Sequence, residues 1–148
     1  MGLNENLDID WSSKIIKPRS KFNVVVLASP EKIFDRLAQD NPDLDIRNNP
    51  SLRIGDRLEK AKKYLIDWGN NPENEEMYGP AEFVPTSVYF DMDDDGNPRL
   101  AIEDGRHRLL AALELGLDEF PIEVSQAGAK YLTEFWYIYY KKTKIWKK

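Results

Sequence analysis

The feature that most constrains this chain is an abrupt change from strand to helix at a single glycine. The segment RLAIE, residues 99–103, has the short apolar character of a strand, and Asp104 and Gly105 follow it directly. A helical pattern, RHRLLAALEL, begins at the next residue and stops before Gly116, a residue type that is common just past a helix C-terminus. The sequence therefore predicts a helix over residues 105–115. Three apolar residues are expected on its buried side: Leu109, Ala112 and Leu113.

The polar residues at this corner can be interpreted in two ways. A helix N-terminus leaves unpaired backbone N–H groups and a partial positive charge, and Gly105 would let an anion approach them closely. Arg106, His107 and Arg108 add cationic donors, and arginine can bind phosphate through two parallel hydrogen bonds. In the simpler interpretation Asp104 caps the helix and both arginines point into solvent. The residues alone favour the simpler interpretation, and both stay open.

Strand and helix signals fill most of the remaining chain. Ser29 followed by Pro30 is typical of a helix start, and Asp56 with Glu59 resembles a capping box at the start of another helix. The aromatic-rich segment 127–142 is compatible with helix or strand, with a preference for helix. The expected strands are 22–27, 86–92, 99–103 and 120–124, and the other expected helices are 30–39 and 56–68. With no repeat and no dividing linker, the sequence predicts one α+β domain over residues 1–148, a small mixed sheet flanked by helices.

The acidic segment DMDDDG, residues 91–96, matches the first half of a calcium-binding loop. The twelfth position of such a loop should be a bidentate glutamate, but here it is Ile102, and Pro98 interrupts the backbone. Strands rather than helices are expected on both sides. The segment therefore predicts a hairpin turn and not a calcium site.

Composition narrows the class of protein. A chain of 148 residues with 41% hydrophobic and 32% charged residues fits one globular domain. The longest apolar runs, VVVLA and FWYIYY, are too short to span a bilayer, and we expect no secretory signal. The absence of cysteine excludes disulfides, thiolate zinc sites and thiol catalysis. It also fits a reducing compartment, so we expect a cytoplasmic protein.

Charge is unevenly distributed along the chain. The net charge is −5, although residues 130–148 contain six lysines and one glutamate, so the rest of the chain is strongly acidic. Such an acidic body suits a basic protein partner or simply solubility, and argues against bulk attraction to nucleic acid. Four residues near the C-terminus fall at helical spacing: Leu132, Phe135, Trp136 and Tyr139. We expect this aromatic stripe to pack on the domain or on another protein chain.

The segment LAIEDGRHRLLAALELGLDEFPIEV, residues 100–124, resembles the core of the ParB/sulfiredoxin superfamily. There a strand leads through a short Gly-x-x-Arg corner into a helix with an alanine pair, and then into another strand. Residues 48–69, NNPSLRIGDRLEKAKKYLIDWG, are similar to the Asn-Pro…Arg segment of the family and the helix after it. The resemblance covers about Phe22 to Ser125, with an extra helix inserted near residues 30–40. Residues 126–148 would form a C-terminal aromatic and basic element.

The resemblance implies a nucleotide-phosphate site at the corner. By position, Gly105, His107 and Arg108 match the Gly, His and Arg of the sulfiredoxin pattern, and Arg106 stands where the reactive cysteine would be. Sulfinic acid reduction is therefore excluded, and at this length we do not expect the helix-turn-helix and dimerisation domains of a chromosome-partitioning ParB. Arg47, Arg53 and Arg57 are the candidates for a second contact to the phosphate, with Arg53 as first choice. A free-standing domain of this kind could be a nucleotide hydrolase, a small-molecule kinase or a ParB-like nuclease.

Two carboxylates, Glu103 and Asp104, precede the glycine, where the family usually has a small residue before it. They would repel a triphosphate unless Mg²⁺ lay between, since this ion binds through one or two carboxylates and phosphate oxygens. The acids therefore indicate either a metal-assisted phosphoryl-transfer or hydrolysis site, where one of them could accept a proton, or a site that has lost its nucleotide.

Three function classes follow, in decreasing order of support. The first is an enzyme that binds a nucleoside triphosphate, with Mg²⁺, at the corner. The second is a non-catalytic acidic interaction or inhibitor protein that keeps the fold as a scaffold. The third is a DNA-binding or nuclease domain that uses the tail YYKKTKIWKK, because lysines interleaved with aromatic residues can hold single strands.

Overall fold

The computed structural model describes Ile9, Trp11, Ser20 and residues 22–69 and 85–135. The elements in this part of the chain are β1 (Asn23–Ala28), α1 (Pro30–Asp40), the 3-10 turns η2 (Pro42–Leu44) and η3 (Pro50–Leu52), α2 (Arg57–Gly69), β2 (Thr86–Met92), β3 (Pro98–Asp104), α3 (Arg106–Glu114), β4 (Phe120–Ser125) and α4 (Gln126–Phe135). All these strands and helices were expected from the sequence, and their boundaries agree to within one residue wherever the predicted boundary lies among the described residues.

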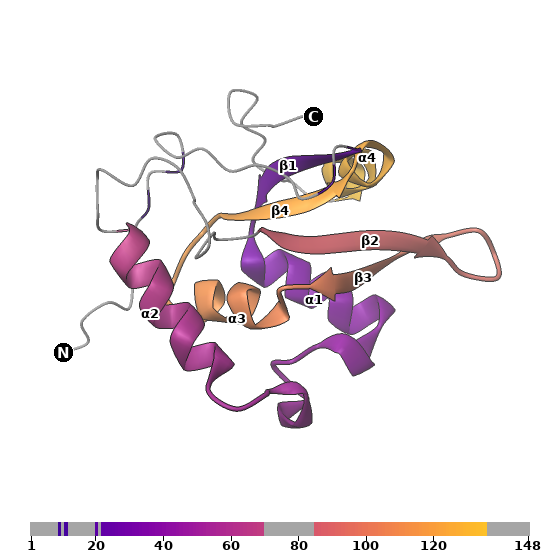
Figure 1. The fold of residues 1–148 in the computed structure, drawn as a ribbon. Coiled ribbons are helices and arrows are strands. Elements are labelled where there is room, and N and C mark those ends of the chain that lie inside the picture. The colour runs from indigo at the N-terminus through magenta and orange to yellow at the C-terminus, as the bar shows by residue number, and fades with distance from the viewer. Residues whose placement is uncertain (1–8, 10, 12–19, 21, 70–84, 136–148) are drawn as a thin grey trace.

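The strands form one mixed sheet in the order β1-β4-β2-β3. β1 pairs antiparallel with β4, β4 pairs parallel with β2, and β2 pairs antiparallel with β3. Figure 1 shows α1 and α3 on one side of the sheet, α2 beside α3, and α4 near the start of β1 and the end of β4. The predicted fold class, α+β with a small mixed sheet flanked by helices, is confirmed.

Helix α1 begins where the sequence predicts. The Ser29 side chain accepts a hydrogen bond from the Lys32 backbone N–H at 3.2 Å, and Pro30 occupies the first turn, where its missing N–H costs nothing. The three apolar residues that repeat at helical spacing, Ile33, Phe34 and Leu37, are fully buried. This helix therefore supplies one wall of the core.

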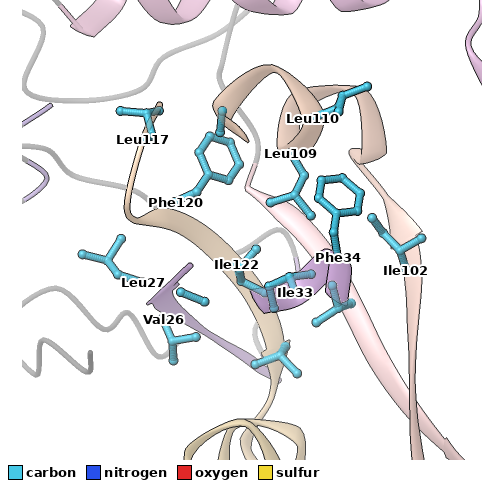
Figure 2. Packing of buried hydrophobic residues seen from close by; sticks show 14 of the residues in the cluster. Val26, Leu27, Ile33, Phe34, Ile102, Leu109, Leu110, Leu117, Phe120 and Ile122 are labelled. Carbon is cyan, nitrogen blue, oxygen red and sulfur yellow. The ribbon is translucent and has the colours of Figure 1, made fainter. Parts of the chain in front are cut away.

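The core lies between the sheet and helices α1 and α3. Figure 2 shows Leu109 of α3 close to Phe34 of α1 and Ile122 of β4, and all three residues are fully buried. Ala112 is fully buried as predicted, whereas Leu113 is only partly buried and packs at the margin of the core. Burial of these side chains fixes α3, and with it the corner at Gly105, against the sheet.

The outer edge of β3 is bonded to the C-terminal end of α1. The Leu100 backbone N–H donates to Asp40 Oδ2 at 2.7 Å, and the Leu100 carbonyl accepts from Asn41 Nδ2 at 2.8 Å. Arg36 holds Asp40 in place through its Nε, which lies 2.8 Å from Oδ2. Two side chains therefore make the hydrogen bonds that a neighbouring strand would make at this position.

The β2–β3 connection is the predicted hairpin turn. Asp93 Oδ1 accepts hydrogen bonds from the backbone N–H groups of Asp95 and Asn97, and Gly96 has a positive φ of 81°. One oxygen of this carboxylate is thus engaged within the turn itself. This geometry does not support the interpretation of residues 91–96 as a calcium-binding loop.

Helix α4 confirms the preference for helix in the first part of the C-terminal segment. Its residue Leu132 is 1% exposed, and the Tyr131 ring lies 5.3 Å from that of Phe90. Trp136, Tyr139 and the lysine-rich tail lie outside the described residues. Within the described ranges, no helix combines the length and the apolar character needed to cross a bilayer.

Candidate functional site

The corner between β3 and α3 depends on Gly105. Its φ of 90° and ψ of 22° lie in the left-handed region, which residues with a side chain rarely adopt. A Cβ at this position would lie 3.0 Å from the Thr86 Cα and 2.7 Å from Arg108 Nη2. The Thr86 hydroxyl donates to the Gly105 carbonyl at 2.9 Å, which ties the corner to β2. Conformation and space both require glycine here.

The expectation that Asp104 could cap the helix is wrong. Gly105 occupies the N-cap position, where it makes no side-chain hydrogen bond, and Asp104 is the last residue of β3. A capping side chain must sit on the N-cap residue to reach the N–H groups of the first turn, and Asp104 lies one residue too early. Instead, Asp104 Oδ2 lies 3.7 Å from Nη2 of Arg108.

A pocket of about 560 Å³ opens at this corner. Its walls come from α2, from the end of β3 and from the first turn of α3. The lining residues are Arg57, Lys60, Ala61, Tyr64, Ile102, Glu103, Asp104, Gly105, Arg106, His107 and Arg108. Four of these side chains are cationic and two are carboxylates, so the pocket is positive within a chain whose net charge is −5. The structure thus brings together every predicted site residue except Arg53.

Helix α2 supplies a wall of the pocket, of which the sequence had indicated only Arg57 as a candidate. Arg57, Lys60 and Tyr64 are three and four residues apart, which places them on one face of the helix. Helix α2 contacts α3 closely, and Lys62 of α2 forms an ion pair with Glu114 of α3. The spacing of these residues was visible in the sequence. Their orientation toward the corner was not, because it depends on how the two helices pack.

The three arginines considered for the second contact have different positions. Arg57 lines the pocket, whereas Arg53 is exposed in the segment before α2 and lies outside the lining among the described residues. Arg47 is engaged elsewhere: its Nη2 lies 3.0 Å from Oδ2 of Asp45, which is 1% exposed. Its guanidinium also lies 5.2 Å from the centre of the Phe34 ring. Arg47 therefore stabilises the Asn-Pro segment rather than facing the corner.

His107 lines the pocket but points its Nε2 at the backbone. The Ile54 N–H donates to Nε2 at 3.1 Å, and the imidazole is 8% exposed. Burial lowers the pKa of His107, and the positive charges of Arg106 and Arg57 lower it further. At neutral pH the ring is therefore uncharged, with the proton on Nδ1.

The two carboxylates have different partners. Glu103 Oε1 accepts from the Ser87 hydroxyl at 3.1 Å, while Asp104 lies beside Arg108. No group of three or more histidine, cysteine or carboxylate side chains capable of holding a metal occurs in the described part of the chain. The donor set fits a magnesium ion only if phosphate oxygens complete its coordination, and both acids line the pocket in which those phosphates would lie.

Comparison with known proteins adds little. No family model matches the chain, and neither does any curated protein. Among solved structures, the chain is similar to one described as Oncogenic Suppression Activity Protein, a plasmid fertility inhibition factor, crystallised as a gold(I) cyanide derivative. The TM-score is 0.46 at 15% identity, over 78% of this chain and 57% of that one. A likeness at this level carries no functional argument, and membership of the ParB/sulfiredoxin superfamily stays a prediction.

Proposed function

We propose that the pocket binds the phosphate groups of a nucleotide at the N-terminus of α3. The observation that carries this proposal is the pocket itself, which gathers four cationic side chains from two helices in an acidic protein. Its volume of about 560 Å³ falls within the range common for small-molecule sites. Positive charge concentrated in a cleft raises the local concentration of an anionic ligand.

The geometry suggests how the ligand would lie. Arg106 and Arg108 flank the backbone N–H groups of the first turn of α3, where one phosphate group would bind. Arg57 and Lys60 on the opposite wall would hold further phosphates. Tyr64 and Ile102 offer apolar surface for a sugar or base. In this arrangement the first turns of α2 and α3 bind the phosphates, and the remaining wall contacts the sugar or base.

The reaction class that fits the proposal is metal-assisted phosphoryl transfer or triphosphate hydrolysis. Asp104 or Glu103 would hold Mg²⁺, which would offset the charge of the phosphates. Without the ion, the Asp104 carboxylate would oppose phosphate binding. A cytoplasmic location belongs to this proposal.

A thermal-unfolding screen of nucleoside mono-, di- and triphosphates, each with and without Mg²⁺, tests the proposal. A ligand present at a hundred times its dissociation constant should stabilise the protein by about 2.7 kcal/mol. We expect triphosphates to stabilise more than monophosphates, because more phosphates meet more cations. If no nucleotide at millimolar concentration raises the unfolding temperature, the pocket does not bind nucleotides.

That negative result would favour the second candidate, an acidic interaction or inhibitor protein. The observation in its favour is the exposed hairpin turn, where Asp94 and Asp95 face solvent. A basic protein would be the partner, and pull-down by the protein but not by a variant with Asp94→Asn and Asp95→Asn would support it. The DNA-acting alternative rests on the tail outside the described residues and stays a prediction.

A further inference from the structure

We propose that His107 is a positioning residue, which fixes the start of α2 against α3 and thereby places Arg57 in the pocket. This differs from the role implied by the sequence resemblance, in which His107 itself holds phosphate. The effect of His107 on anion binding rests on the proposed function. The contact that carries it is independent of any ligand.

Two consecutive hydrogen bonds connect His107 to the first residue of α2. The Ile54 N–H donates to His107 Nε2 at 3.1 Å, and the Ile54 carbonyl accepts from the Arg57 N–H, also at 3.1 Å. Gly55, with a φ of 53°, makes the tight turn between them. Only one residue therefore relays the position of the imidazole to the backbone of Arg57. The buried ring, which is 8% exposed, has little freedom to turn toward a ligand instead.

The direction of the first bond fixes the charge of the ring. A backbone N–H can only donate, so Nε2 must accept and cannot carry a proton. An imidazolium would place two N–H groups head to head and break the contact. The same Nε2 atom cannot donate to a phosphate while it accepts from Ile54. In this arrangement His107 contributes neither a charge nor an Nε2–H donor to the anion.

Acidification should therefore weaken the contact between His107 and Ile54. Glu103 and Asp104 of β3 line the same pocket as His107. The charged groups that lower the pKa of His107 are Arg106 and Arg108 on α3, Arg57 on α2, and Arg53 in the loop before α2. All are cationic, and with burial they hold the pKa of His107 below its usual value near 6.5. Because the unfolded chain binds the proton more readily, the stability due to this contact is present above about pH 6.5 and is lost as pH falls through the lower folded pKa.

His107 is the only histidine of the chain, so nitrogen NMR of the ligand-free protein reads its state without overlap. We expect the shifts of an acceptor Nε2 and a protonated Nδ1 at neutral pH, and a titration below the pKa of an unperturbed histidine. We also expect Nε2 to remain unprotonated when inorganic pyrophosphate is added. A protonated Nε2 in either state would overturn the inference.

A double-mutant cycle with pyrophosphate as the probe tests whether His107 acts through Arg57. His107→Leu removes the acceptor and should weaken binding about fivefold, the usual effect of one lost hydrogen bond. His107→Gln keeps an acceptor at similar reach and should retain most of the affinity without its pH dependence. Combined with Arg57→Ala, His107→Leu should cause no further loss.

Other outcomes separate the two proposals. Losses that multiply in the double variant would show that His107 contacts the anion itself and would overturn the positioning role. Absence of pyrophosphate binding by the wild-type protein would refute the proposed phosphate site, whereas the ligand-free tautomer of His107 would still decide whether the ring anchors Ile54. If His107→Leu does not fold, the wild-type spectrum and the His107→Gln variant carry the test.

Discussion

The two ends of β3 carry nearly the same sequence signal and differ in structure. Each has acidic residues followed by a glycine with positive φ, Gly96 at 81° before the strand and Gly105 at 90° after it. Around Gly96 no atom of the described residues, apart from its chain neighbours, lies within 4 Å of where a Cβ would be. Around Gly105 the Thr86 backbone and the Arg108 side chain fill that space. One glycine serves a turn in solvent, and the other serves a crowded corner beside a pocket.

The difference lies in where the polar groups are directed. In the hairpin, Asp93 accepts from two backbone N–H groups of its own turn at 2.9 and 2.8 Å. At the corner, the left-handed glycine displaces Asp104 from the capping position, and the first turn of α3 opens into the pocket. A carboxylate that bonds its own turn indicates a structural role. Charged groups gathered around an open helix N-terminus indicate a binding site.

The largest expected effect comes from alanine at the two glycines. Gly105→Ala should lower the free energy of unfolding by about 3 kcal/mol, because backbone strain of about 1–2 kcal/mol adds to a clash with the Thr86 backbone. Gly96→Ala should cost only the strain, about 1 kcal/mol, because its surroundings are open. Urea denaturation of both variants measures the difference. Equal losses would mean that the corner relaxes around a methyl group.

The next largest effect is expected from replacing one of two arginines that lie near the two ends of β3. Arg108→Ala should weaken nucleotide binding by about 1.5–3 kcal/mol, the cost of a lost charge-assisted hydrogen bond. Arg99→Ala, the matched control, removes a partly exposed arginine whose Nε lies 3.2 Å from Asp91 Oδ1 and should leave binding unchanged. Titration calorimetry compares them. If both variants bind like the wild type, Arg108 does not contact the ligand.

A smaller effect is expected from neutralising Asp104. Asp104→Asn should tighten nucleotide binding in the absence of metal, because it removes a like charge beside the phosphate, and should reduce the dependence of binding on Mg²⁺. Its stability should stay within about 0.5 kcal/mol of the wild type, because Asp104 is not the helix cap. Asp94→Asn, at a residue of the hairpin that faces solvent, is the control for charge alone. A similar change in binding for both variants would indicate a long-range effect of net charge.

The smallest effect is a pH dependence at the hairpin. Hydrogen bonds from the backbone N–H groups, above all that of Asn97, lower the pKa of Asp93. The folded state therefore gains stability from the ionised carboxylate above about pH 4, and this gain is lost as pH falls through the lowered pKa. The stability difference between wild type and Asp93→Ala should shrink in acid. If the stability difference does not change with pH, the loss in Asp93→Ala comes from packing and not from the ionised carboxylate.

Much of the fold follows from local signals that survive in the structure. Ser29 and Pro30 define the start of α1, and the acidic turn with Gly96 defines the hairpin, because each depends on neighbours within a few residues. Only part of the site could be predicted from the sequence. The sequence located the corner, but Arg57 and Lys60 reach it from a helix about fifty residues away, and their place depends on how α2 packs on α3.

Two residues of the corner have surroundings that the sequence did not predict. His107 was assigned as a cation for phosphate, and Asp104 as a possible cap. The sequence did not show that the backbone of Ile54 would occupy the imidazole, nor that a left-handed glycine would take the cap position. Local patterns therefore identified which residues gather at the corner. They did not identify which partner each side chain would face.

The side chains of Asp40 and Asn41, which bond to Leu100, also limit how two molecules of this protein can associate through their sheets. An open strand edge offers alternating N–H and C=O groups to any extended chain nearby, which is a common start of aggregation. On β3 the donor and acceptor of Leu100 are already engaged by a loop-and-helix terminus that cannot be extended as a strand. Another sheet cannot continue this one past Leu100 unless the end of α1 first moves away.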